Sequence, residues 1–579
     1  MRQQRSVWNT NNALVACFIA LFAVSLCYFP NMGGVGLGLP LNTLTYALLA
    51  GMVLLISVRG VSRRGGFITP TAMYFSCGVL LLCLPLAFSP AGDTSTSAWR
   101  VAGLLAGWGL YCAWLQRRLN ARWRGALVVC LVLMVSVQAA IALLQLFLPA
   151  WSWVPMRGSR VFGIFQQPNV LGSFLATGLA LTLMLALLPG YVLPSAVWEK
   201  GRKATLSLLL LVLTALLVWV QSRTGWLAGA LVLLGYWAVW GRRFPRQLVV
   251  LGGWMLLGCA LGLGVLLAAD EGGGLHSHAM SNQARLAMLL DTLKMIAAHP
   301  FVGWGYGSFE AAFQQFRISQ QPPTAVLEIA RHPHNEILLW WLEGGVVALL
   351  GMLAIVAGAV RLCVQALAHD RRAFAAGRGD AGEATCLCLA LLPMALHSQL
   401  EYPFYLSALH WLVFVLLLAT VDRLSCRHSR LIGTAGHGLI AVRGGVALLC
   451  LAGMVLMLEI FRGGLALTIV ERGGLRDMRP LQSMSPLAKW GLQQRRSFDL
   501  QTHRLLAYNV SRDDAELDRY AVWAQHYLTT RVDANVYANL IAILRHQQQS
   551  AVAERYRSSA ALLFPRDRRF YPPTATSKV

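Results

Sequence analysis

Charged residues are scarce in this chain. Only 13% of its 579 residues are charged and 56% are hydrophobic, where a soluble protein carries about 25% charge. The mean hydropathy is +0.55. Too few polar groups are present to cover a water-soluble fold of this length, so the composition excludes that class and predicts a polytopic membrane protein.

Acidic residues are scarcer than basic ones, at 25 against 49, which gives a net charge of +24. Such an excess can indicate nucleic-acid binding, but its placement argues for the lipid bilayer as the partner and against nucleic acid. Basic residues gather in alternate short loops, whereas the opposite short loops hold only Arg100, Arg157, Arg160 and Arg223. This positive-inside pattern predicts a cytoplasmic N-terminus and, with an odd number of spans, a C-terminus outside.

Cysteine is absent from 270–335 and 464–579, the two long segments expected outside the membrane. This excludes a disulfide framework and a CxxC metal or redox site in them. The chain also lacks a Walker A loop, a dinucleotide fingerprint and a cluster of metal ligands at suitable spacing. We therefore expect no cofactor and no metal, and a transfer reaction would need a pre-activated donor.

The hydrophobic runs predict an all-α membrane protein with about thirteen transmembrane helices. The expected spans are 13–29, 41–58, 71–88, 101–115, 125–149, 169–188, 204–221, 226–240, 247–269, 337–363, 384–399, 403–421 and 440–461. They divide the chain into an N-terminal transmembrane block (1–269), a large periplasmic loop that carries site residues (270–335), a C-terminal transmembrane block (336–463) and a periplasmic helical tail (464–579).

The loop and the tail have their own helical patterns. Arg285–Ile296 has apolar residues at helical spacing, and His299-Pro300 ends it. The glycine-interleaved run Phe301–Gly307 suits either a backbone close to a ligand or membrane, or an ordinary turn. The tail has three amphipathic stretches, which resemble helical-hairpin repeats of the tetratricopeptide kind that bind partner proteins, or else form a small helical cap; they are Ala515–Leu528, Ala534–Leu544 and Ala551–Leu563.

The segment His332-Pro333-His334-Asn335-Glu336 ends the loop and opens the apolar run Ile337–Cys363. A histidine, with an ordinary pKa near ~6.5, at the edge of a membrane suits proton transfer on a substrate that is half lipid and half water-soluble. The same segment also suits a helix cap at Asn335. The local sequence does not choose between these two interpretations.

Several arginines expected outside run against the positive-inside bias, so a role other than topology is indicated. Arg160 precedes Phe165-Gln166-Gln167-Pro168-Asn169, Arg223 lies in a very short turn between two spans, and Arg285 begins the loop helix. A guanidinium makes bidentate contacts with phosphate oxygens, so these groups near His334 would match a polyprenyl pyrophosphate donor. Binding of lipid headgroups is the alternative for each one alone.

Two further polar features accompany these arginines. Glu401 and Tyr402 lie in a turn expected outside, with His397 just within the membrane, and they offer a carboxylate and a phenol at the same face; a purely structural turn is equally open. Glu343 lies within an apolar span, where a carboxylate needs a partner or a water-filled cavity. A structural role is favoured for Glu343.

The residues around His334 resemble the motif of a known protein family. His334-Asn335, nine residues and then Gly345, placed at the start of a span after a large loop, resemble the signature of bacterial O-antigen ligases and related O-oligosaccharyltransferases. Arg223 and Arg285 resemble the family's two periplasmic arginines. The family usually has Gly, Thr or Tyr three residues after the glycine, where this chain has Ala348.

One branch of the family is closer than the others. The Phe165–Asn169 segment and the Glu401-Tyr402-Pro403 turn resemble the protein-directed, PglL-like branch that glycosylates pilin. The resemblance covers about 150–425. It implies a donor of undecaprenyl pyrophosphate carrying a glycan, and transfer to a Ser or Thr hydroxyl of a periplasmic protein such as pilin, without metal or nucleotide. The acceptor would bind at the periplasmic face of the inner membrane and through the tail.

The resemblance also implies roles for the site residues. His334 would be the catalytic base, and Arg160, Arg223 and Arg285 would bind the pyrophosphate; the residues that would orient donor or acceptor are Gln167, His332, Asn335, Glu401 and Tyr402. Three other functions stay open: ligation of O-antigen to lipid A core, polymerisation of O-antigen, and transport of lipid-linked sugars. A transporter would show internal repeats and more ionisable groups within the spans, and neither is found.

Overall fold

A computed structural model describes residues 2–60, 66–88, 94–156, 158, 160–268, 279–324, 326, 328–427, 430–432 and 437–571. Within these residues the protein is almost wholly helical, and the only strands described are β1 (Gly66–Ile68) and β2 (Arg430–Ile432). They form one antiparallel pair with Phe67 opposite Leu431. Arg157 lies outside the described residues.

Each of the thirteen expected spans lies largely on a helix. These helices are α1 (Arg2–Val24), α2 (Pro40–Gly60), α3 (Pro70–Cys83), α4 (Thr94–Leu115), α5 (Ala121–Phe147), α6 (Pro168–Leu187), α7 (Ala196–Trp219), α8 (Arg223–Trp240), α9 (Pro245–Ala268), α12 (Glu336–Ala375), α13 (Glu383–Ser398), α15 (Ala408–Ser425) and α16 (His437–Arg472). Over the described part of the chain, nine helical segments are long and apolar enough to cross a membrane. The predicted all-α, polytopic membrane fold is confirmed.

Short helical turns link these elements. They are η1 (Gly36–Gly38), η2 (Leu84–Ala87), η3 (Pro149–Trp151), η4 (Pro189–Tyr191) and α14 (Pro403–Leu406). The turn α14 precedes α15, so the run expected as one span over 403–421 begins with a separate short helix that Ser407 ends. Ser407 then caps α15 by accepting a hydrogen bond from the backbone N–H of His410.

The most enclosed of these helices is α6, with 17 of its 20 residues buried. It is apolar on every side, as expected for a helix surrounded by others, and it packs against α5, α7, α8 and α13. Close packing depends on small residues: a Cβ atom on Gly172 would lie only 2.9 Å from Oγ of Ser222. This fixed helix begins at Pro168, so the residues around its N-terminus are held in place.

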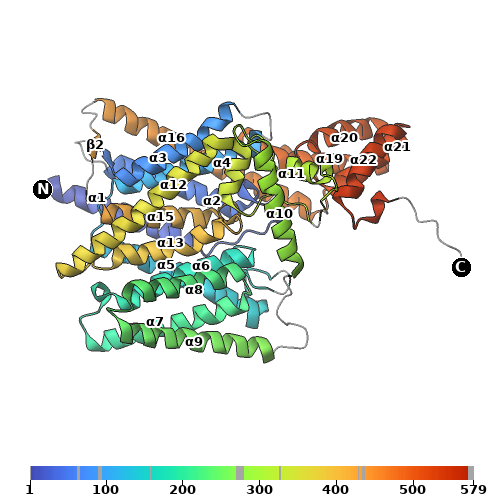
Figure 1. Cartoon of the computed structure of the whole chain (residues 1–579). Helices are drawn as coiled ribbons and strands as arrows, with labels where there is room; N and C mark the ends of the chain where they lie inside the picture. Colours follow the sequence, from blue (N-terminus) through green and yellow to red (C-terminus); the bar gives the residue numbers. More distant parts are fainter. Residues whose placement is uncertain are drawn as a thin grey trace.

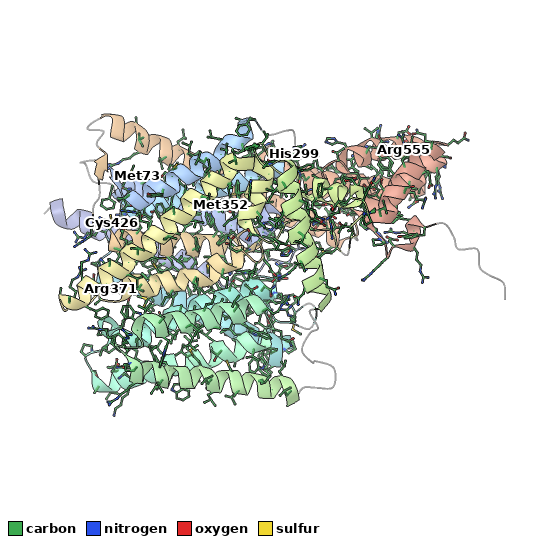
Figure 2. All side chains as sticks on the ribbon, in the orientation of Figure 1. Met73, His299, Met352, Arg371, Cys426 and Arg555 are labelled. Atoms are coloured by element: carbon green, nitrogen blue, oxygen red, sulfur yellow. The ribbon has the colours of Figure 1, made fainter. Side chains whose placement is uncertain are left out.

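Two helices of the loop lie at one end of the bundle, which we call the loop end (Figure 1). They are α10 (Ala279–Ala298) and α11 (Phe309–Ser319). His299 lies at the loop end, whereas Arg371 and Cys426 lie at the opposite end (Figure 2). The helix predicted over Arg285–Ile296 is therefore confirmed, and it ends immediately before His299-Pro300. The sequence pattern did not predict α11.

The glycine-rich segment Phe301–Gly307 packs against a break in α12. Gly345 has a φ of +64° there, which interrupts the backbone hydrogen bonds of the helix. The backbone of the segment bonds to the groups left open at this break. Trp304 N–H donates to Leu342 O at 2.9 Å, and Val346 N–H donates to Phe301 O at 3.1 Å. A Cβ on Gly303 would lie 2.6 Å from Glu343 O, so only glycine fits. The backbone of this segment thus lies close to α12, a neighbour that the sequence pattern did not indicate.

The tail forms a helical unit beside α11, in the orange and red part of Figure 1. Its helices are α17 (Arg479–Gln482), α18 (Pro486–Gly491), α19 (Gln493–Ser511), α20 (Asp514–Tyr527), α21 (Ala534–His546), α22 (Ser550–Leu563) and η5 (Arg568–Phe570). The three predicted amphipathic helices correspond to α20, α21 and α22. Their core includes Leu540 and Leu544, and Ala311 of α11 joins it.

An ion pair fixes the tail to the loop. Glu310 of α11 accepts from Nη1 of Arg531 at 2.9 Å and from the backbone N–H of Val532 at 3.0 Å. The same carboxylate lies 3.6 Å from Nε of Arg331, the residue that precedes His332. The tail is therefore connected through one buried carboxylate to the segment that carries the two neighbouring histidines.

Candidate functional site

His334 lies in the short link between the loop and α12, and its backbone is left-handed, with a φ of +58°. This conformation is rare for a residue with a side chain. Its N–H donates to Nδ1 of His332 at 2.9 Å, and Nε2 of His332 lies 3.3 Å from Oε1 of Glu336. Because Nδ1 of His332 accepts, its Nε2 carries the hydrogen that faces Glu336. His332 thus stabilises the turn that presents His334.

The imidazole of His334 is mostly buried beside Tyr402, with 5.6 Å between ring centroids. Its Nδ1 has no hydrogen-bond partner among the described residues. Burial lowers the pKa of His334 to about 4; Glu401 acts to raise it, and His332 and Arg285 lower it further. The ring is therefore neutral near pH 7 and able to accept a proton.

Asn335 serves as the helix cap that the sequence pattern allowed. Its Oδ1 accepts from Leu338 N–H at 3.0 Å, and its Nδ2 donates to Gln399 O at 3.3 Å. The second bond joins the start of α12 to the turn after α13. In that turn Tyr402 stacks near His332, with ring centroids 4.9 Å apart, and burial raises the pKa of the Tyr402 phenol.

Glu401 connects three helices, α6, α10 and α13, through its two carboxylate oxygens. Oε1 accepts from Nη2 of Arg285 at 2.7 Å and from Nδ2 of Asn169 at 2.6 Å. Oε2 lies 3.2 Å from Nε2 of His397. Burial raises the pKa of Glu401, but the hydrogen bond from His397 and the charge of Arg285 lower it more, to about 2. The carboxylate is therefore ionised at any ordinary pH.

Two of the candidate arginines lie at one face of α10. Arg285 is on this helix, with 33% of its side chain exposed. Arg223, the first residue of α8, donates to Oδ1 of Asn282, also on α10. Asn282 and Arg285 are three residues apart, so they share a helix face. The structure thus places both guanidinium groups at the loop end, with Arg285 partly open to solvent.

Arg160 is placed differently. Its Nε and Nη2 donate to Val220 O at 3.1 and 3.0 Å, and Nη2 also donates to Gln221 O at 2.9 Å. These carbonyls follow the C-terminal end of α7, which favours a cation. Burial lowers the pKa of Arg160, and Glu401 raises it. Arg160 therefore holds the α7–α8 turn in which Arg223 lies.

A cavity of about 400 Å³ opens beside this cluster. Its lining combines aromatic rings, two amides and the guanidinium of Arg160; it consists of Gly33, Gly34, Leu39, Gly158, Arg160, Phe162, Phe165, Gln166, Gln167, Pro168 and Leu406. Oε1 of Gln167 caps α6 by accepting from Asn169 N–H at 2.6 Å and Val170 N–H at 3.4 Å. Gln166 has a left-handed backbone, with a φ of +59°.

The structure therefore brings most of the expected site residues into one cluster, and places Arg160 and Gln167 at the cavity on its side. Sequence reasoning missed Asn169 as a partner of Glu401, although it lay in a segment already noted. It also missed Glu336, whose Oε2 accepts from Tyr405 at 3.3 Å and Trp340 at 3.1 Å. The spacing of Glu336 and Trp340, four residues apart on a helix, was an available signal.

Glu343 has the partner that its burial required. Its carboxylate accepts from Arg100 of α4 and from the backbone N–H of Phe309, the latter at 3.1 Å. The Arg100 guanidinium also lies over Trp340, 4.5 Å from the ring centroid. Arg100 was one of the arginines that ran against the positive-inside bias. This pair joins α4, α11 and α12, which accords with a structural role.

Three protein-family models match the chain. The model described as O-antigen ligase matches residues 208–353, which include Arg223, Arg285 and His334. The model described as the C-terminal part of a virulence factor membrane-bound polymerase matches residues 385–575. A model described as protein glycosylation ligase matches residues 161–186, the start and most of α6. No curated protein matches the chain.

These matches cover the site residues on both sides of the cluster and confirm the resemblance drawn from the motifs. Taken together, the three matches support the superfamily of O-antigen ligases and PglL-like protein glycosylation ligases for this multi-pass membrane protein, and they imply a glycosyltransferase-type activity on a lipid-linked glycan and a protein or lipid acceptor.

Proposed function

We propose that this protein is an O-oligosaccharyltransferase of the bacterial inner membrane. It moves a glycan from undecaprenyl pyrophosphate to a Ser or Thr hydroxyl of a periplasmic protein such as pilin. The loop end and the tail face the periplasm in this proposal, and the N-terminus lies in the cytoplasm, as the positive-inside pattern predicts.

One observation carries the proposal. His334 is a neutral imidazole, with its pKa lowered to about 4, and it lies in a cluster with Glu401 and the partly exposed side chain of Arg285. A base and a cation that can reach a phosphate are the two groups that transfer from a pyrophosphate donor to a hydroxyl requires. The cluster lies at the end of a membrane bundle, where a lipid-linked donor can reach it.

The chemistry then follows from these groups. His334 takes the proton of the acceptor hydroxyl as its oxygen attacks the anomeric carbon. The bond between that carbon and the pyrophosphate oxygen breaks, and undecaprenyl pyrophosphate leaves with the electron pair. Arg285 and Arg223 stabilise the negative charge on the leaving group. A single displacement inverts the anomeric configuration.

Two observations favour a protein acceptor. The protein glycosylation ligase model matches α6, whose Asn169 binds Glu401 in the cluster. The tail contacts the loop through Glu310, which also lies 3.6 Å from Arg331 beside the histidines. A helical unit attached at this point suits recognition of a folded acceptor better than recognition of a lipid.

The match to an O-antigen ligase model over 208–353 keeps ligation to lipid A core as the second candidate. A reconstituted reaction separates the two. Purified protein would receive a glycan on undecaprenyl pyrophosphate together with pilin and lipid A core, and mass spectrometry would identify the product. We expect glycan on a Ser or Thr of pilin. Glycan on lipid A core alone would reverse the choice, and no transfer to either acceptor would contradict the proposal.

A further inference from the structure

Below Glu401 a chain of polar side chains extends into the bundle. His397 of α13, Ser173 of α6 and His410 of α15 are each 0% exposed. Nδ1 of His397 lies 2.8 Å from Oγ of Ser173, and Nε2 of His410 lies 3.0 Å from Val170 O. Polar groups are costly to bury in a membrane bundle and need hydrogen-bond partners there. A chain of such groups therefore indicates a role beyond packing.

The hydrogen positions on His397 follow from its partners. Glu401 is ionised, so its Oε2 can only accept, and Nε2 of His397 must carry the hydrogen between them, across 3.2 Å. On the other side of the ring, the hydroxyl of Ser173 is also within 3.1 Å of Val170 O. The ring is therefore held from both sides, by α6 and by the turn after α13.

This bond decides which way the Glu401 carboxylate points. With Oε2 bound to His397, Oε1 is directed at Arg285 and Asn169. Without His397, the carboxylate would be free to rotate, and Arg285 would lose the orientation in which its side chain is partly exposed. The effect of His397 on a ligand is indirect, because His397 itself is fully buried.

We propose that His397 is a positioning residue for the donor site: through Glu401 it holds Arg285 in the orientation that binds the donor's pyrophosphate. The inference rests on the proposed function, because it takes Arg285 as a phosphate ligand. Its distinctive consequence is energetic coupling between His397 and Arg285, and not between His397 and Arg223, which donates to Asn282 instead.

A double-mutant cycle tests this coupling. Affinity for undecaprenyl pyrophosphate without glycan would be measured by the tryptophan fluorescence of the purified full-length protein in detergent. We expect His397→Ala to weaken binding about tenfold, in line with the loss of a charge-assisted hydrogen bond. In an Arg285→Ala background the same change should cost less than about twofold, whereas in an Arg223→Ala background it should again cost about tenfold.

Two further variants separate positioning from folding. His397→Gln places an amide N–H near Nε2 and should restore most of the affinity, with the donor KM rather than kcat carrying any residual change. His369→Gln is the matched control, since His369 is also buried but lies near the far end of α12, beside Asp380. It should leave binding within about twofold. Thermal unfolding of each variant would be recorded alongside.

The outcomes are distinct. An equal loss for His397→Ala in both arginine backgrounds, or a loss for His369→Gln as large as that for His397→Ala, would show a general packing role and overturn the inference. Wild-type protein that binds undecaprenyl pyrophosphate but transfers no glycan would contradict the proposed function and leave the cycle to decide on His397. Wild-type protein that does not bind this lipid would overturn both.

Discussion

The guanidinium of Arg285 donates to the carboxylate of Glu401 across 2.7 Å, although 116 positions separate them in the chain. This ion pair places the loop helix α10 on the turn between α13 and α14. One-third of the Arg285 side chain stays exposed, so under the proposed function this residue stays accessible to a phosphate. A donor pyrophosphate would therefore meet a cation that is already oriented.

Replacing Arg285 should weaken use of the donor. We expect Arg285→Ala to raise the donor KM about 10- to 100-fold, since a charge-assisted hydrogen bond contributes about 1.5–3 kcal/mol. Arg285→Lys should restore little, because lysine lacks the fork that binds two oxygens. Steady-state kinetics with a lipid-linked glycan would measure this. Arg519→Ala, in the exposed part of the tail, is the control and should not change KM.

Replacing the proposed base should lower kcat. His334→Gln removes the proton acceptor, and we expect kcat to fall about 10²- to 10⁴-fold with little change in donor KM. Single-turnover transfer with purified variants would measure this, and thermal unfolding would check the fold. A variant that retains wild-type kcat would rule out His334 as the base.

Activity should depend on pH through His334. The ring accepts a proton only when neutral, and its pKa in the folded protein is about 4. We expect kcat/KM to be flat from neutral pH to about 5 and to fall below it, with a midpoint near 4. Glu401, whose pKa is about 2, stays ionised over this range. A midpoint near the ordinary histidine value would show instead that water reaches the ring.

Stability should follow the same group. Between the ordinary pKa of histidine and about 4, the unfolded chain binds a proton at position 334 that the folded chain does not bind. Stability should therefore decrease as pH falls through this window. The decrease should be absent in His334→Gln, measured as the unfolding temperature at stepped pH values.

Breaking the Arg100–Glu343 pair should destabilise the bundle. Arg100→Ala leaves a buried carboxylate with one partner fewer, which costs about 3–5 kcal/mol in known cases. Replacing both residues by leucine should cost less, because no unpaired charge remains. Thermal unfolding in detergent would compare the variants. Equal losses for the single and double replacements would show that the charges contribute little.

Removing Glu310 should loosen the tail. Glu310→Ala deletes the acceptor for Arg531 and for the backbone N–H of Val532. We expect faster hydrogen exchange around Val532, with the inner turns of α21 protected by their own core. Glu554→Ala, which breaks a pair within α22, is the control and should leave exchange at Val532 unchanged.

The sequence predicted the helices well because hydrophobic periodicity is local. It did not predict α11 or α19, which carry many polar residues and meet neighbours distant in the chain. Glu401 was noted as a candidate, but its contact with Asn169 spans 232 positions, and no local pattern specifies such a pair. Likewise, Arg160 was grouped with the phosphate ligands, whereas its donors reach the α7–α8 turn.

The break in α12 at Gly345 has a mechanical consequence. Backbone hydrogen bonds join Phe301 to Val346 and Trp304 to Leu342. The chain between them, which includes His334, is therefore a loop whose two ends are held together. Because its ends are bonded to each other, this loop does not open as a hinged lid. In the proposed reaction, the donor would therefore meet a loop whose two ends stay fixed to each other.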